Sequence, residues 1–184
     1  VANCQLGIVS LDENGEGNLL ASDLDFSATP SSDVCGPLTF SFDQAGMVTS
    51  MDYDCADVGQ FPITVYVSDV NGNTAPCVTS VLVEDQLAPN ALCINGLTVG
   101  LSESPLLATD LDGGSNDNCT APEDLTFIMA LMIDDTGNPE DDFLFLGNSY
   151  DLSCSDIGDH TFLLGVTDEE GEGSSCEVTV SIVD

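Results

Sequence analysis

The stretches FPITVYVS (61–68) and VTSVLVE (78–84) decide the fold of this chain. Both are short runs rich in β-branched and aromatic residues, and the Asn71-Gly72 pair between them is typical of a hairpin turn. Segments 161–167 and 177–183 show the same pattern near the end of the chain. Since no segment of ten residues shows a helical period, the sequence predicts an all-β protein.

The chain contains two copies of one unit, residues 1–85 and 90–184, joined by a short linker at 86–89. Five landmarks recur in the same order, which indicates duplication. They are LLASDLD (19–25) and LLATDLD (106–112), SSDVC (31–35) and SNDNC (115–119), CADVG (55–59) and CSDIG (154–158), VSDVNGNTAPC (67–77) and VTDEEGEGSSC (166–176), and SVLVED (80–85) and TVSIVD (179–184). The second copy also carries an acidic insertion near 133–142.

The charge of the chain excludes several classes of function. Its 184 residues include 33 Asp and Glu, no Lys or Arg and one His, which gives a formal net charge of −33. Such a chain repels phosphate backbones and anionic lipids, so nucleic-acid binding is excluded. The longest apolar stretch, 125–133, is too short to span a bilayer, and no membrane insertion is predicted.

The repeat resembles the hyalin-repeat type of immunoglobulin-like domain, found in tandem in secreted and surface proteins that include many bacterial adhesins. The resemblance covers nearly all of each copy and rests on Cys55-x-Asp57-x-Gly59, VYVSDVNGN (65–73), Cys77 and the closing VLVED (81–85). It implies two tandem immunoglobulin-like antiparallel β-sandwiches.

Eight cysteines in a chain of this length indicate disulfide bonds and an extracellular or cell-surface location. Zinc is the rival explanation, but the chain has no CxxC pair and a single imidazole. Three pairings are open within each copy, and spacing does not choose among them. In a sandwich, however, the first and last strands would bring their cysteines to one end. The favoured pairs are therefore Cys4–Cys77, Cys93–Cys176, Cys35–Cys55 and Cys119–Cys154.

The placement of the acidic residues indicates calcium. Asp outnumbers Glu by 23 to 10, and the acids gather at strand ends beside Gly, Asn and Ser. A solvated, charged surface explains their number but not this placement. In immunoglobulin-like copies, the Asp-x-Asp loop, the turn after the penultimate strand and the last residue of the preceding domain would meet at one end. The predicted ligands of Ca²⁺ there are Asp85, Asp110, Asp112, Asp117 and Asp168.

The first copy repeats this cluster in Asp23, Asp25, Asp33 and Asp69, and Asp184 is the counterpart of Asp85. A neighbouring chain whose Asp184 met the first-copy cluster would extend into a head-to-tail homopolymer. Covalent continuation and strand donation both remain open as ways of joining the subunits.

No catalytic residue is predicted. Paired carboxylates occur in glycosidases, and Asp141 with Asp142, or Asp151 with Asp156, could supply such a pair. The chain nevertheless has no Trp for sugar stacking, no cationic group to hold an intermediate and no Ser-His-Asp motif.

The sequence thus predicts a structural subunit of an extracellular fibre or filament, stiffened by calcium and braced by disulfides. The alternative is a calcium-dependent adhesin or glycan-binding module of a larger surface protein, with Tyr53 and Tyr150 as candidate aromatic contacts for glycans. Asn118 begins an N-glycosylation sequon, although its middle residue is a cysteine expected to be bridged.

Overall fold

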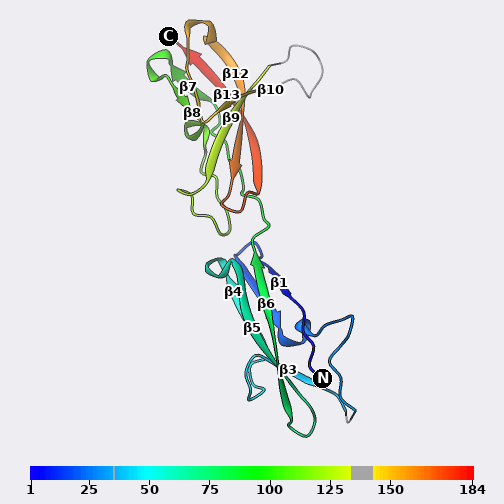
Figure 1. The fold of residues 1–184 in the computed structure, drawn as a ribbon. Helices are drawn as coiled ribbons and strands as arrows, with labels where there is room; N and C mark the ends of the chain where they lie inside the picture. Colours follow the sequence, from blue (N-terminus) through cyan, green and yellow to red (C-terminus); the bar gives the residue numbers. More distant parts are fainter. Residues whose placement is uncertain (35, 134–142) are drawn as a thin grey trace. The chain divides into compact units, whose positions relative to one another are not determined.

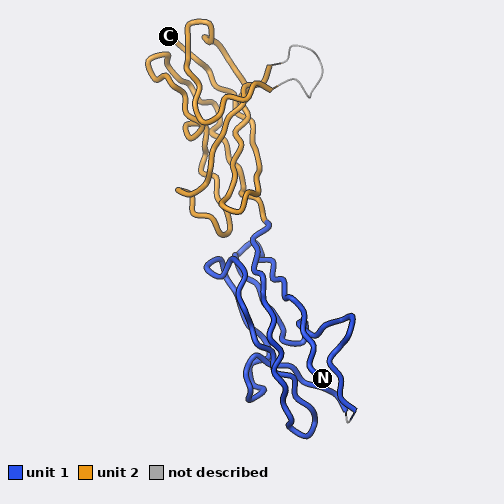
Figure 2. Tube along the Cα trace, viewed as in Figure 1, with its two compact units in different colours: residues 1–86 blue, residues 87–184 orange. Residues whose placement is uncertain are grey.

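The computed structural model describes residues 1–34, 36–133 and 143–184 (Figure 1). The chain divides into two compact units, Val1–Gln86 and Leu87–Asp184 (Figure 2). This division falls inside the segment that the repeat pattern predicts as a linker. Nearly all of the acidic insertion near 133–142, including the glycosidase candidates Asp141 and Asp142, lies outside the described residues, and so does Cys35.

The first unit has two sheets built from the strands among its described residues. One sheet has the order β1-β6-β5-β3, and the other pairs β2 with β4. The strands are β1 (Gly7–Ser10), β2 (Glu16–Leu20), β3 (Thr39–Ser41), β4 (Ser50–Asp54), β5 (Gly59–Ser68) and β6 (Thr74–Glu84), with 3-10 turns η1 (Ala21–Leu24) and η2 (Cys55–Asp57).

The second unit repeats this plan with one more strand in the larger sheet. That sheet has the order β10-β9-β12-β13-β7, and β11 pairs with β8. The strands are β7 (Leu97–Gly100), β8 (Leu106–Leu107), β9 (Thr126–Met132), β10 (Phe143–Gly147), β11 (Ser149–Tyr150), β12 (Gly158–Thr167) and β13 (Gly173–Val183), with 3-10 turns η3 (Leu101–Glu103), η4 (Ala108–Leu111) and η5 (Cys154–Asp156).

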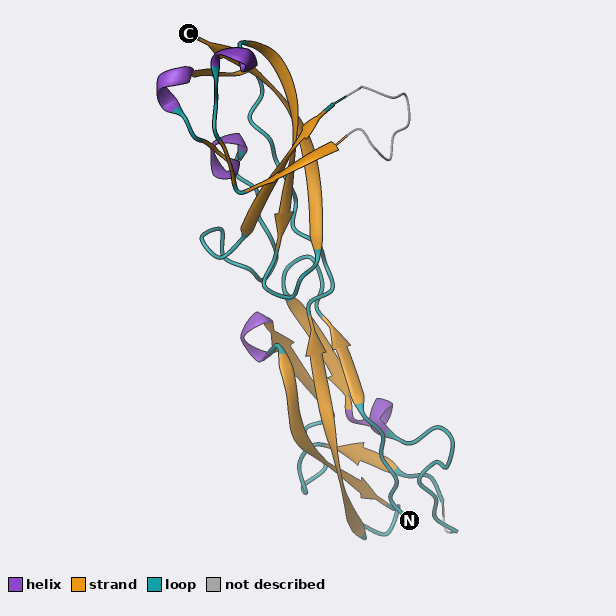
Figure 3. Cartoon of the chain, turned by 45° about the horizontal axis from the view of Figure 1, so that its top comes forward, coloured by secondary structure: helices purple, strands orange, loops and turns teal. Residues whose placement is uncertain are grey.

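The predicted all-β, immunoglobulin-like class is confirmed. The described part of the chain has strands and short 3-10 turns but no α-helix (Figure 3). Each unit is organised around a long antiparallel hairpin, β5–β6 or β12–β13, at the segments singled out in the sequence. The first strand of each unit pairs in parallel with the last, β1 with β6 and β7 with β13. Strand patterning does not reveal this parallel pair, because alternation carries no information about strand direction.

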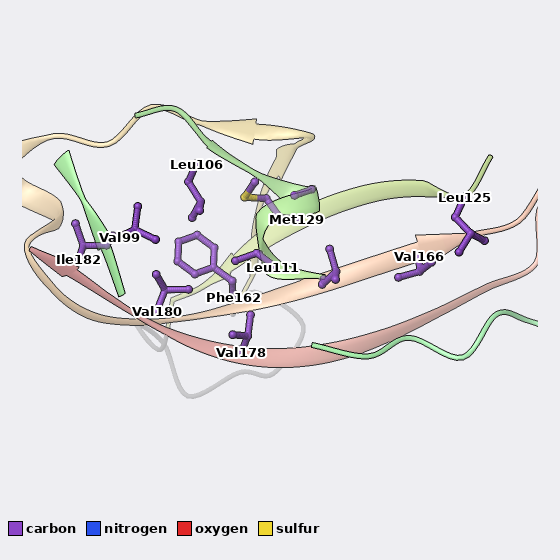
Figure 4. Close-up of a cluster of buried hydrophobic side chains, with 12 residues drawn as sticks. Val99, Leu106, Leu111, Leu125, Met129, Phe162, Val166, Val178, Val180 and Ile182 are labelled. Atoms are coloured by element: carbon purple, nitrogen blue, oxygen red, sulfur yellow. The ribbon is translucent and has the colours of Figure 1, made fainter. Parts of the chain in front are cut away.

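Alternation along the hairpin strands builds the core of the second unit (Figure 4). Phe162, Leu164 and Val166 point inward from β12 and are fully buried. Successive side chains on a strand point to opposite faces, so every second residue enters the core. The core is completed from the other layer by residues such as Leu106 and Leu111, which β8 and η4 supply.

In each unit, one disulfide ties the opening segment to the last strand. Cys4 bonds Cys77 across 73 positions, and Cys93 bonds Cys176 across 83. These are the two pairs that the sandwich argument favours. Closing loops of this length contributes about 4 kcal/mol each by restricting the unfolded chain.

The predicted Cys119–Cys154 bond is wrong, because Cys154 carries a free, exposed thiol. Cys154 opens η5, just before β12 begins, whereas the loop of Cys119 lies beside the turn that follows β12. A ten-residue strand spans about 33 Å, far beyond the reach of a disulfide. The Cys35–Cys55 pair includes a residue outside the described part of the chain.

Removing the Cys93–Cys176 disulfide tests its contribution to the stability of the second unit. In a Cys154→Ser background, Cys93→Ser with Cys176→Ser is expected to lower the free energy of unfolding of that unit by about 4 kcal/mol. Urea denaturation measures the loss. Cys154→Ser alone should change the free energy of unfolding by less than about 0.5 kcal/mol, because the Cys154 thiol is exposed and forms no disulfide. Equal effects of the two changes would contradict this account.

Candidate metal centre

In the turn after β12, only one of the two carboxylate oxygens of Asp168 accepts hydrogen bonds. Asp168 Oδ1 accepts the backbone N–H groups of Gly171 at 2.7 Å and Glu172 at 2.8 Å. The side chain is only 6% exposed, and Asp168 Oδ2 is buried with no hydrogen-bond partner. One oxygen therefore shapes the turn, while the other is a desolvated anionic atom.

The two carboxylate oxygens of Asp117 differ in the same way. Its Oδ2 accepts the backbone N–H groups of Cys119 at 2.9 Å and Thr120 at 2.8 Å. Its Oδ1 is buried and has no hydrogen-bond partner. Two neighbouring loops thus each present one buried carboxylate oxygen that the protein does not satisfy.

Thr120 connects these two loops. It is 4% exposed, and its Oγ1 accepts the backbone N–H of Glu169 at 3.3 Å. Thr120 therefore contacts both loops: its N–H donates to Asp117, and its hydroxyl accepts an N–H from the turn of Asp168. This shared contact places the two open carboxylates at the same end of the second unit.

The opening segment of the second unit fixes the Asp117 loop from its other side. Asp112 Oδ1 accepts the N–H of Ser115 at 2.9 Å. The hydroxyl of Ser115 accepts the N–H of Leu92 at 2.9 Å, and Asn90 exchanges backbone hydrogen bonds with Asn116. The loop is therefore held by backbone contacts on both sides, which preorganises any ligand that it carries.

Burial makes the open oxygens costly. A buried polar group without a hydrogen bond destabilises the folded state, and a buried charge without a counter-charge does so much more. The chain has no Lys or Arg, and His160 lies elsewhere, with its Nε2 2.9 Å from the Asp156 carbonyl oxygen. The electrostatics of the two loops suit a hard cation with oxygen ligands, and Ca²⁺ is the cation that most readily accepts an irregular set of them.

Of the other predicted ligands, Asp110 differs from Asp117 and Asp168 because it lies at the surface. Asp110 is exposed, and its Oδ2 accepts the N–H of Leu107 at 2.8 Å, which caps η4. Asp85 directly follows β6 in the first unit and is 4% exposed. Among the described residues, no group of three or more Asp, Glu, His or Cys side chains could hold a metal. The five-carboxylate site stays a prediction.

In the first unit the corresponding turn is closed. Asp69 Oδ1 accepts the N–H groups of Asn71 at 2.9 Å and Asn73 at 2.8 Å. Asp69 Oδ2 accepts the side-chain amide of Asn73 at 2.7 Å. The Asn73 amide, together with these backbone donors, holds the pKa of Asp69 below its ordinary value.

The remaining members of the first-unit set lie at the surface or in loop contacts. Asp25 Oδ1 accepts the N–H of Ser31 at 2.8 Å. Asp23, Asp33 and Asp184 are exposed. None of the three has the burial that makes Asp168 costly.

The glycan candidates offer no exposed aromatic platform. Tyr53 is 5% exposed, and its ring packs 5.8 Å from that of Phe61. Tyr150 is half-buried and donates its hydroxyl to Asp156 Oδ1 at 3.0 Å. Asn118, the predicted glycosylation site, is half-buried in the Asp117 loop.

Comparisons with known proteins give structural likenesses only. No family model and no curated protein matches the chain. Human mucin-like protocadherin EC1-2 matches with TM-score 0.39 and 14% identity over 100% of this chain and 97% of that one. Human protocadherin-24 EC1-2 matches with TM-score 0.41 and 16% identity over 100% of this chain and 97% of that one. DIP-gamma IG1+IG2 matches with TM-score 0.39 and 10% identity over 97% of this chain and 94% of that one. Likenesses this distant carry no inference about function, and none supports a bacterial origin.

Among the described residues, no helix is long and apolar enough to cross a membrane. The disulfides are typical of proteins in oxidising compartments, outside the cytosol.

Removing the Thr120 hydroxyl tests the contact between the loops. Thr120→Val keeps the shape of the side chain but leaves the Glu169 N–H without its acceptor, so unfolding should become easier by about 1–2 kcal/mol. Urea denaturation gives the energy, and faster hydrogen exchange at the Glu169 amide locates it. Thr120→Ser retains the hydroxyl and should behave like the parent chain. If the valine and serine variants exchange alike, the contact does not hold the loops.

Proposed function

We propose that this chain is a calcium-binding pair of immunoglobulin-like domains in an extracellular adhesion protein, with no catalytic role. The observation that carries the proposal is the pair of buried, unsatisfied oxygens, Asp117 Oδ1 and Asp168 Oδ2. A cation bound there removes the cost of burying them. The disulfides support an extracellular location, where calcium is abundant enough to fill sites of modest affinity.

The ligand chemistry favours calcium over magnesium. Magnesium demands near-ideal octahedral geometry and keeps several waters, whereas calcium accepts six to eight oxygens in irregular arrangements. Asp117 and Asp168 would each supply one carboxylate oxygen, and carbonyl groups and water would complete the shell. The remaining oxygen of each aspartate stays bound to backbone N–H groups, which fixes the direction of the ligand.

The first unit supports an adhesive module over a fibre subunit. A head-to-tail polymer needs the Asp69 cluster to receive Asp184 of a neighbour through a shared cation. Both oxygens of Asp69 already accept hydrogen bonds within its own turn. The adhesive alternative needs no such end-to-end site. With a net charge of −33, a partner protein with a positively charged surface is the complementary class.

Asp156, one of the carboxylates that could serve a glycosidase, does not have the property that a general acid needs. Such a residue needs a raised pKa. The hydrogen bond from the Ser153 side chain, helped by that from Tyr150, instead lowers the pKa of Asp156. This direction argues against Asp156 as a general acid.

Calcium should raise the melting temperature of the chain. Linkage gives about 2.7 kcal/mol of added stability at a concentration one hundred times the Kd. Asp168→Asn should abolish this gain, because the asparagine oxygen can still accept the two turn N–H groups while its amide replaces the open oxygen. The same loss of buried charge should leave the chelator-treated variant as stable as the parent chain or more so. Differential scanning calorimetry with calcium and with chelator measures both.

Asp110→Asn is the matched control, since it makes the same chemical change at an exposed cap. Any effect of this change on η4 should be the same in calcium and in chelator. A parent chain that melts identically in both solutions would overturn the calcium proposal. If Asp110→Asn loses as much of the calcium-induced rise in melting temperature as Asp168→Asn does, the site is not at the buried oxygens.

Electron microscopy separates the adhesive module from the fibre subunit. Negatively stained chains in millimolar calcium should remain separate particles. Regular threads that fall apart on chelation would support the fibre subunit and contradict the proposal made here.

A further inference from the structure

The two units contain the same turn at the end of the penultimate strand. It runs Asp69-Val70-Asn71-Gly72-Asn73 in the first unit and Asp168-Glu169-Glu170-Gly171-Glu172 in the second. The N–H of the aspartate donates to the carbonyl of the fifth residue at 3.0 Å in one and 3.1 Å in the other. In both, the fifth N–H returns to Oδ1 of the aspartate at 2.8 Å. The backbone template is therefore shared.

The fifth side chain is where the two turns differ chemically. Asn73 donates its amide to Asp69 Oδ2 at 2.7 Å. Glu172 stands at the matching position, and an ionised carboxylate has no proton to donate. Asp168 Oδ2 is correspondingly left buried without a hydrogen bond.

We infer that this fifth residue decides which unit takes the cation: Asn73 closes the first turn, and Glu172 leaves the second open to calcium. The pair then binds calcium at the Asp117 and Asp168 loops of its second unit and not at the equivalent loops of its first. This inference rests on the proposed calcium binding and assigns it to one of two duplicated sites.

Local charge acts in the same direction. The turn of the second unit has four acidic residues in five positions, whereas the first has only Asp69. Neighbouring carboxylates repel one another, and a divalent ion bound among them offsets that repulsion. The loop partners differ in burial too, since Asp33 is exposed where Asp117 is half-buried with one fully enclosed oxygen. Only the second unit combines an acidic turn with an enclosed, unsatisfied ligand.

Exchanging the fifth residue tests the assignment in the full chain. Glu172→Asn supplies the missing amide and removes one charge, so calcium affinity by isothermal titration calorimetry should fall about tenfold or more. In chelator this variant should melt at a higher temperature than the parent chain, because Asp168 Oδ2 gains a donor. Glu169→Asn is the matched control, with the same change in charge within the same turn. Its calcium affinity should stay within about twofold of the parent value.

A second variant addresses the first unit directly. Asp69→Asn should leave both the affinity and the stoichiometry of calcium binding unchanged. A loss of one bound calcium in Asp69→Asn would overturn the inference, as would equal affinities in Glu172→Asn and Glu169→Asn, while the proposed function would stand in both cases. A parent chain that binds no calcium would overturn the proposed function and the inference together.

Discussion

The absence of Lys and Arg governs how this protein is built. Its carboxylates cannot form the usual salt bridges with basic side chains, so each must face water, accept an N–H or hydroxyl proton, or meet an added cation. The turns show the second solution. Asp12 accepts the N–H groups of Asn14 and Glu16, and Asp43 accepts those of Met47 and Val48. These backbone donors lower the pKa of both groups, so the stability they add at neutral pH is lost as pH falls through the folded-state pKa.

Burial changes the consequence of this arrangement. At the surface, water satisfies whichever carboxylate oxygen the backbone leaves free, and the turn is complete. The second oxygen of Asp168 is instead buried without a hydrogen bond, so it becomes a cost to folding. Under the proposed calcium binding, part of the stability of this fold depends on the ionic composition of its surroundings. For a domain outside the cell, that composition includes calcium at concentrations that suit a weak site.

The sequence predicts the hairpin strands and the two terminal disulfides because these depend on local alternation and on the order of strands in a sandwich. β5, β6, β12 and β13 are visible as runs of β-branched residues, and the Cys4–Cys77 bond follows once the first and last strands are neighbours. The free thiol of Cys154 could not be found this way, because three pairings per copy are equivalent in spacing. The structure separates Cys154 from Cys119 by the length of β12, a distance that appears only when the strand is laid out in space.

The candidate metal site shows a second limit of sequence patterns, since an aspartate is recognised by its type and not by what its oxygens already bind. Asp69 and Asp168 occupy the same landmark, yet one is satisfied and the other is not. The difference lies four residues later, where an amide in one copy is replaced by a carboxylate in the other. A search for ligands must therefore count the donors around each carboxylate as well as the carboxylates themselves. By that measure the duplicated chain has one turn geometry with two outcomes: the second carboxylate oxygen is satisfied within the turn in the first unit and is left buried without a hydrogen bond in the second.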